Sequence, residues 1–178
     1  MPTRLPPSLR QKLRGVKLFL CDVDGVMTDG TVWMGDAGEN KRFHIRDGLG
    51  LKFLQRHGIK VGWVSRRPSP ATQRRADDLK IDFLIQSDSD KVPAIEALLQ
   101  RVSLNWSQTC YVGDDVVDVG ALNHAAVAVA VADAVPEARA AADYVTKERG
   151  GLGAIRETVE LILKAQNKWQ LVLAEYGA

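Results

Sequence analysis

The stretch LFLCDVDGVMTDG, residues 18–30, decides how the rest of the chain is interpreted. An apolar run typical of a buried strand ends in two aspartates, Asp22 and Asp24, and Gly25 follows them. Two carboxylates this close repel each other, and taking either of them out of water costs free energy. We therefore expect positive charge from elsewhere in the chain, or a bound cation, to lie beside them.

The composition indicates one domain spanning residues 1–178. Of the 178 residues, 46% are hydrophobic, which is enough for a substantial core. The formal charge is only +2, and no stretch approaches the roughly 20 apolar residues of a membrane span, so we expect neither nucleic acid nor a membrane as a partner. Residues 1–15 lack the apolar region of a secretory signal. Cys21 and Cys110 lie in apolar runs, as reduced core cysteines do, and we expect a soluble cytoplasmic protein.

Short apolar runs alternate with helical patterns from residue 16 onward. Strands are expected at 16–21, 59–65, 82–87, 109–115, 126–131 and 142–146. Helices are expected at 48–58, 69–80, 92–102, in a short segment ending near 124, at 136–142 and at 152–166. The first helix would turn Leu49, Phe53 and Leu54 inward, and Ser69 with Pro70 would begin the second. This alternation predicts an α/β fold with a doubly wound, mainly parallel, Rossmann-like sheet and helices on both faces.

One segment breaks the alternation. Two strand-like pieces, 31–34 and 41–45, flank the turn sequence Gly-Asp-Ala-Gly at 35–38. This pattern predicts a small β-hairpin over about 30–46. Ligands of open α/β sheets bind outside the carboxyl ends of the strands, so the hairpin would stand as a flap over Asp22 and Asp24.

Polar residues follow the apolar runs where the predicted strands end. They are Asp22 and Asp24 after the first strand, Ser65 after the second, Lys91 after the third, and Asp114, Asp115 and Asp118 after the fourth. The ends of parallel strands share one edge, so these groups converge there. Asp22, Asp24 and Asp114 can then share a hard divalent cation such as Mg²⁺, which prefers oxygen ligands. Taken singly, each signal has an ordinary structural interpretation, such as a helix cap for Asp115.

The motifs DVDGV, a strand-terminal serine, a lysine before a helix and GDDVVD, in this order, resemble those of haloacid dehalogenase superfamily phosphatases. The segments RDGLG, SDKV, VAVADAVPEARAAADYVT and GGLGAIRE are similar to the capless branch of that superfamily. The resemblance covers roughly residues 16–163. It implies an enzyme without a large cap domain, in which Asp22 attacks phosphorus and Asp24 acts as general acid and then as general base. Ser65 and backbone N–H groups of the DVDG loop would hold the phosphoryl oxygens, and Lys91 would keep Asp22 ionised and offset its repulsion with the phosphate.

The resemblance also implies a set of metal ligands. Mg²⁺ would be bound by the Asp22 carboxylate, the Asp24 backbone carbonyl and the Asp114 carboxylate. Asp115 and Asp118 would support this set without taking part in the chemistry.

The expected substrate is a small sugar-acid phosphate. The positions that contact substrate in the capless branch carry His44, Ile45, Arg46, Asp47, Gly48, Lys52, Arg67, Arg75 and Lys91. An arginine at 67 resembles members that act on 3-deoxy-D-manno-octulosonate 8-phosphate, a lipopolysaccharide precursor, whereas members that act on N-acylneuraminate 9-phosphate tend to carry glutamate there. Two departures bear on the substrate: Arg66 replaces the usual glycine of the second motif, and Lys52 replaces a usual arginine.

Two other interpretations stay open. One is a phosphatase of the same branch that acts on a nine-carbon ulosonate or another sugar phosphate. The other is a phosphate-binding regulatory module, because response-regulator receivers also place clustered aspartates, a Ser or Thr and a Lys on a parallel sheet. Receivers lack the second aspartate of the DxD motif and lack the flap hairpin.

Capless relatives close their open sites by assembling as tetramers, so the resemblance implies a homotetramer. Trp33 on the hairpin is a candidate subunit contact. In the tail, about 165–178, one apolar helical face carries Trp169, Val172, Leu173 and Tyr176. This apolar face either contacts a neighbouring subunit or packs against the body of its own subunit.

Overall fold

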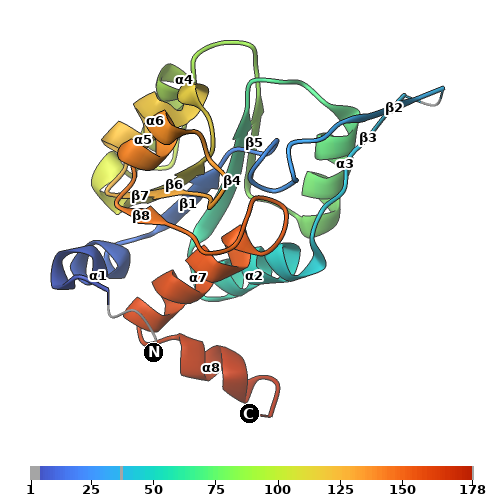
Figure 1. The fold of residues 1–178 in the computed structure, drawn as a ribbon. Helices are drawn as coiled ribbons and strands as arrows, with labels where there is room; N and C mark the ends of the chain where they lie inside the picture. Colours follow the sequence, from blue (N-terminus) through green and yellow to red (C-terminus); the bar gives the residue numbers. More distant parts are fainter. Residues whose placement is uncertain (1–4, 37, 178) are drawn as a thin grey trace.

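The computed structural model of the protein describes residues 5–36 and 38–177, and its centre is a six-stranded parallel sheet (Figure 1). The strands lie in the order β5-β4-β1-β6-β7-β8, and every neighbouring pair is parallel. Their bounds are β1 Leu18–Cys21, β4 Lys60–Ser65, β5 Phe83–Gln86, β6 Thr109–Gly113, β7 Val127–Ala130 and β8 Tyr144–Val145. The chain winds one way from β1 to β5 and the other way from β6 to β8, so the switch point lies between β1 and β6.

Helices cover both faces of this sheet, which confirms the predicted doubly wound α/β fold (Figure 1). One face carries α2 (Ile45–Arg56), α3 (Pro70–Leu79) and α7 (Ala154–Ala165), and the opposite face carries α4 (Lys91–Arg101), α5 (Val119–His124) and α6 (Pro136–Ala140). Short 3₁₀ helices at Trp106–Gln108 and Val116–Asp118 flank β6. Ser69 caps α3 by accepting a hydrogen bond from the Thr72 amide at 3.2 Å, and Pro70 begins the helix, as predicted.

The core lies between the sheet and the two helical layers. All four residues of β1 are fully buried, and Trp63 and Tyr111 are the largest side chains enclosed beside them. The inward face of α2 contains Phe53 and Leu54 as predicted, but Leu49 is exposed and Leu51 is buried instead. The prediction for Leu49 was wrong because the buried stripe of α2 passes through Asp47, Gly50, Leu51 and Leu54, at i, i+3, i+4 and i+7 spacing, and Leu49 lies outside it.

The flap is a two-stranded antiparallel hairpin that projects from the body (Figure 1). Its strands are β2 (Trp33–Gly35) and β3 (Gly38–Asn40), and the turn falls within the predicted Gly-Asp-Ala-Gly sequence. The second predicted strand, 41–45, was wrong. Residues 41–44 have no regular structure and α2 begins at Ile45, because Phe43 stacks on Trp63 in the body at a centroid distance of 6.0 Å instead of pairing with a strand.

Two short helices lie near the ends of the described chain. The first, α1 (Pro7–Arg14), was not predicted; it packs Leu9 and Leu13 against the core. The last, α8 (Trp169–Ala174), buries Val172 on its own subunit, and Trp169 contacts the Phe53 ring edge-on at 6.1 Å. These contacts favour the own-subunit interpretation of the tail. Among the helices of residues 5–36 and 38–177, none combines the length and the apolar character needed to cross a membrane.

Candidate active site

Asp22 begins the site because it follows the last residue of β1 and remains tied to the sheet. Its amide donates to the Val112 carbonyl at 3.0 Å, and its Oδ1 accepts from the Val23 amide at 2.7 Å. The side chain is almost fully buried. Burial raises the pKa of the Asp22 carboxyl to about 6, although the nearby Lys91 ammonium acts in the opposite direction.

Lys91 supplies the positive charge that was expected beside the aspartates of the DVDG motif. It is the first residue of α4 and is buried, with Nζ 3.1 Å from Asp22 Oδ1 and 2.6 Å from Asp118 Oδ1. Burial alone would lower the pKa of a lysine, but the two carboxylates raise it above its ordinary value. Lys91 therefore stays protonated beside Asp22.

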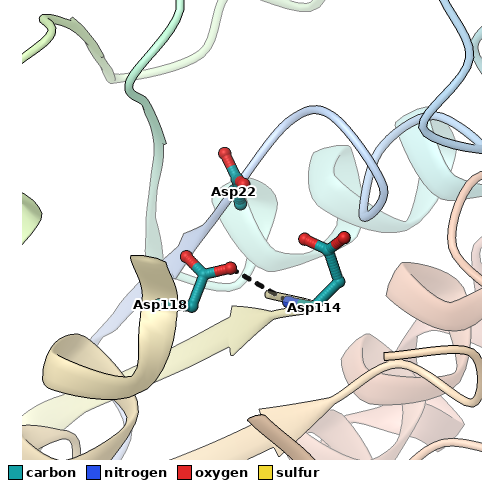
Figure 2. A group of neighbouring side chains, drawn as sticks. All are labelled: Asp22, Asp114 and Asp118. Atoms are coloured by element: carbon teal, nitrogen blue, oxygen red, sulfur yellow. Dashed lines mark hydrogen bonds between the residues drawn. The ribbon is translucent and has the colours of Figure 1, made fainter. Parts of the chain in front are cut away.

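Asp114 stands at the end of β6, on the strand adjacent to Asp22 (Figure 2). Gly25 leaves the space that this carboxylate occupies. A Cβ at position 25 would lie 2.0 Å from Asp114 Oδ2, and the positive φ of 87° at Gly25 disfavours any side chain. Burial, together with the negative charges of Asp22 and Asp118, raises the pKa of Asp114 to about 8.

Asp118 lies below these two carboxylates and has a different role (Figure 2). Its Oδ1 accepts from Lys91 Nζ and from the Tyr111 hydroxyl, both at 2.6 Å. Its Oδ2 accepts from the amides of Asp114 at 3.0 Å and Asp115 at 3.2 Å. Asp115 completes a capping box with it: the Asp115 side chain accepts from the Asp118 amide, while the Asp118 side chain accepts from the Asp115 amide. Asp118 thus holds Lys91 and the 114–115 loop in place.

These residues fit a bound divalent cation. Oxygens of Asp22, Asp114 and Asp118 lie within 4.8 Å of one another, but both Asp118 oxygens already accept hydrogen bonds. Asp114 Oδ1 is buried and has no hydrogen-bond partner among the described residues. An orphaned carboxylate oxygen in a cluster with excess negative charge is what Mg²⁺ satisfies. We therefore take Asp22 and Asp114 as the side chains suited to hold the ion, with Asp118 behind them.

Ser65 ends β4 at the same edge and is buried. Its hydroxyl accepts from the Arg67 amide and lies at the same distance, 3.1 Å, from the Arg67 carbonyl. The unusual Arg66 points away from this loop: its guanidinium donates to the Asp88 carbonyl at 2.9 Å, in the segment before α4. Arg66 therefore links two loops at the rim of the site and does not fill the space above Ser65.

Asp24 lies in the loop after β1 and faces the flap rather than Lys91. Lys41 Nζ lies 2.7 Å from its Oδ1, and an Arg67 guanidinium nitrogen lies 3.9 Å from its Oδ2. Arg67 also pairs with Glu39 on β3, which accepts a 2.6 Å hydrogen bond from Ser69. Lys41 and Glu39 were not predicted as site residues from the sequence. Lys41 was included in the wrongly predicted strand, where a charged residue looks like a solvated one.

The other expected substrate contacts are spread over α2 and α3. His44 precedes α2, and Ile45 and Arg46 are exposed in its first turn. Asp47 is buried and caps α7, accepting from the amides of Gly153 at 3.1 Å and Arg156 at 2.7 Å.

Within one subunit, the remaining three expected contacts lie against neighbouring helices. Gly48 packs so closely on Arg75 that a Cβ would lie 2.8 Å from its guanidinium. Arg75 pairs with Asp78. Lys52 donates to the Leu79 carbonyl at 2.6 Å, at the end of α3 that is opposite the site edge. One subunit therefore brings together Asp22, Asp24, Ser65, Arg67, Lys91 and Asp114, but it does not bring Asp47 or Lys52 to them.

The chain is similar in sequence to known phosphatases. Residues 83–155 match the family model described as haloacid dehalogenase-like hydrolase. The chain is 42% identical over 159 residues to the 3-deoxy-D-manno-octulosonate 8-phosphate phosphatase of Yersinia pestis, covering 89% of this chain and 85% of the relative. The protein of the same name from Haemophilus influenzae is 41% identical over 161 residues, with 90% and 89% covered. The chain belongs to the 3-deoxy-D-manno-octulosonate 8-phosphate phosphatase family.

A solved member of this phosphatase family has the same fold. The crystal structure from Moraxella catarrhalis, in complex with magnesium ion, phosphate ion and KDO, matches with a TM-score of 0.92 at 38% identity over 94% of this chain and 97% of that chain. The predicted superfamily and fold are therefore confirmed, and the chain is a phosphatase of the haloacid dehalogenase superfamily. The magnesium ion of the Moraxella phosphatase is the kind of cation that the carboxylates of Asp22 and Asp114 suit.

Proposed function

We propose that this phosphatase removes phosphate from 3-deoxy-D-manno-octulosonate 8-phosphate in a Mg²⁺-dependent reaction through an aspartyl-phosphate on Asp22. The observation that carries the proposal is the meeting of the Asp22 and Asp114 carboxylates with the Lys91 ammonium at one sheet edge. The relatives from Yersinia and Haemophilus, named for this substrate, support the choice of sugar.

In the first step, an Asp22 oxygen forms a bond to phosphorus while the bond from phosphorus to the leaving oxygen breaks. Lys91, 3.1 Å from Asp22, keeps this carboxylate ionised and attracts a phosphoryl oxygen. The Ser65 hydroxyl turns from its own loop to a second phosphoryl oxygen. Asp24 delivers its proton to the leaving oxygen, which departs as the sugar hydroxyl.

In the second step, the Asp24 carboxylate takes a proton from the water that attacks the phosphorus of the aspartyl-phosphate. The bond between phosphorus and the Asp22 oxygen breaks, releasing inorganic phosphate and restoring the carboxylate. The Asp22 and Asp114 carboxylates and the Asp24 backbone carbonyl would hold Mg²⁺. When bound, the ion would offset the repulsion between the anionic nucleophile and the anionic phosphate.

Arg67 is the residue best placed to recognise the sugar acid. Its side chain is about half exposed, beside Asp24 at the edge of the site, and a guanidinium fork suits a carboxylate. Arg75 lies on α3, where its guanidinium carbon is 5.9 Å from the centroid of the Phe43 ring.

Phosphate release from a substrate panel tests the proposal. The panel contains 3-deoxy-D-manno-octulosonate 8-phosphate, an N-acylneuraminate 9-phosphate, common sugar phosphates and p-nitrophenyl phosphate, each with Mg²⁺. We expect kcat/KM to favour the octulosonate by about a hundredfold, or roughly 2.7 kcal/mol. A flat profile overturns the substrate, and no release from any compound overturns the enzyme in favour of a binding module. Asp22→Asn should abolish turnover while leaving the fold intact, as circular dichroism measures it, and Asp115→Asn serves as its matched control.

We also propose a single-domain subunit, residues 1–178, that assembles as a homotetramer in the cytoplasm. One continuous core from Leu9 to Val172 supports the single domain. The exposed apolar residues Trp33, Met34 and Ile45 on the flap and at the start of α2 support assembly through this surface. Two free, buried cysteines, Cys21 and Cys110, fit a reducing compartment. Calorimetry should show one unfolding transition, and fractionation of the source cells should recover the protein with the cytoplasmic enzymes.

A further inference from the structure

Lys41 is an uncommon feature of the flap because its side chain is fully buried. It lies between β3 and α2, and 0% of its side chain is exposed. Its Nζ is 2.7 Å from Asp24 Oδ1, 3.1 Å from Thr72 Oγ1 and 3.5 Å from Glu39 Oε1. Burying an ammonium group is costly unless it is paired. Here Lys41 and Arg67 balance the charges of Asp24 and Glu39.

Anchoring the flap does not by itself account for Lys41. Glu39 already ties β3 to the body through Ser69 and Arg67. The carboxylate nearest to the Lys41 ammonium is Asp24, in the loop after β1, and not Glu39 of the flap. A buried cation is thus directed at Asp24, to which the proposed function assigns proton transfer.

We propose that Lys41 is a positioning residue that holds the Asp24 carboxylate where its proton reaches the leaving oxygen. The inference rests on the proposed role of Asp24. The Lys41 ammonium contacts Asp24 through Oδ1 at 2.7 Å, whereas Oδ2 lies 3.9 Å from the nearest Arg67 nitrogen. Lys41 therefore fixes the place of the carboxylate through Oδ1 and leaves Oδ2 to carry the proton. Without Lys41, the cation remaining beside Asp24 is Arg67 at 3.9 Å, and the carboxylate turns toward it.

The test compares leaving groups that differ in their need for a proton. Lys41→Met keeps the length of the side chain and removes its charge. Rapid mixing measures the rate constant of the first step with p-nitrophenyl phosphate, whose leaving group departs without a proton, and with an alkyl phosphate, whose leaving oxygen requires one. We expect the rate constant for p-nitrophenyl phosphate divided by that for the alkyl phosphate, the leaving-group ratio, to rise about tenfold or more in Lys41→Met. An unchanged ratio overturns the proposal, whether or not both rates fall together.

Lys60→Met is the matched control, because Lys60 pairs with Asp82 at 2.8 Å at the other edge of the sheet. It should leave the ratio as in the wild type. If Lys41→Met fails to fold, Lys41→Gln takes its place in the same assay.

Asp24→Asn separates failure of this inference from failure of the proposed function. If Asp24→Asn leaves the leaving-group ratio unchanged, the proposed role of Asp24 is wrong. If Asp24→Asn raises the ratio and Lys41→Met does not, only the role of Lys41 is wrong. Adding Lys41→Met to Asp24→Asn should change the ratio no further, because the two residues act as a unit. A further rise of the same size as in the single variant overturns the proposal.

Discussion

Asp114 and Asp118 lie four residues apart at one sheet edge, yet their surroundings prepare them for different tasks (Figure 2). Asp118 accepts four hydrogen bonds and is fully committed to Lys91, Tyr111 and the loop of residues 114–115. Asp114 keeps a buried oxygen without a partner among the described residues. The hydrogen bonds around each carboxylate, and not its distance from the others, therefore separate a supporting residue from a metal ligand.

Asp118→Asn should destabilise the protein strongly. The side-chain amide nitrogen introduced at position 118 would face hydrogen-bond donors. The buried Lys91 would also lose one of its two carboxylate partners. Breaking a buried pair in this way costs about 3 kcal/mol in the free energy of unfolding, measured by urea denaturation. Asp115→Asn, an exposed change in the same loop that keeps an acceptor oxygen, should cost under about 1 kcal/mol. Equal costs for the two variants would contradict the assigned role of Asp118.

Mg²⁺ affinity should weaken as the pH falls from 8 to 6. The pKa of Asp114 is raised to about 8, so below that pH the cation must displace a proton. One displaced proton weakens the apparent affinity about tenfold per pH unit, which calorimetric titration measures. The folding stability of the cation-free protein changes with pH in the opposite direction. Asp114 contributes most to the free energy of unfolding below its ordinary pKa of about 3.9, and this contribution is lost as the pH rises to about 8. A Mg²⁺ affinity that does not change between pH 6 and 8 would contradict this account.

At the scale of elements, the flap and α3 are joined at one residue. The Ser69 hydroxyl caps α3 and donates to Glu39 on β3. The same hydroxyl thus begins the helix behind the second motif and fixes the hairpin over the site. The position of the flap depends on this contact as well as on the Arg67 pair.

Ser69→Ala should loosen the flap as well as remove a cap. Loss of the N-cap costs about 1 kcal/mol, and loss of the Ser69–Glu39 hydrogen bond should speed amide hydrogen exchange in β2 and β3. Asn105→Ala is the matched control. It removes a comparable cap, because Asn105 accepts from the Ser107 amide at the start of the 3₁₀ helix Trp106–Gln108, which is not part of the flap. It should reduce stability without changing exchange in the hairpin. Unchanged hairpin exchange in Ser69→Ala would show that Ser69 does not anchor the flap.

Most of the sheet and the site edge could be predicted because their signals are local. An apolar run followed by DVDG or GDD marks a strand end whatever surrounds it. The start of α2 and the loss of the strand at 41–45 could not be predicted, because Phe43 is held by stacking on Trp63, a contact between segments far apart in sequence. Lys41 and Glu39 were overlooked for the same reason: their partners Asp24, Arg67 and Ser69 come from other loops.

At the scale of the whole molecule, the hairpin that carries Glu39 projects away from the body (Figure 1). The hairpin is tied to the body through Glu39 and exposes Trp33 and Met34. Expected substrate contacts at Asp47 and Lys52 are engaged elsewhere within one subunit. An assembly that covers the exposed hairpin would enclose the site without a cap domain.

Light scattering after size exclusion tests this assembly. We expect a tetramer at micromolar concentration, and we expect Trp33→Asp with Met34→Asp to shift it to smaller species, because charges would replace the apolar contact. Leu171→Asp, an equally exposed apolar position on α8, should leave the tetramer intact. A wild-type monomer would contradict the proposed assembly.

The proposed reaction depends on a covalent bond between Asp22 and the phosphoryl group of the octulosonate substrate. To trap this bond, enzyme, Mg²⁺ and 3-deoxy-D-manno-octulosonate 8-phosphate are mixed, quenched with acid during turnover and reduced with borohydride, and the peptides are mapped by mass spectrometry. Reduction of an aspartyl-phosphate converts the residue to homoserine. We expect homoserine at position 22 in the wild type, whereas turnover with an unmodified Asp22, or with modification at Asp24 instead, would contradict the proposed nucleophile.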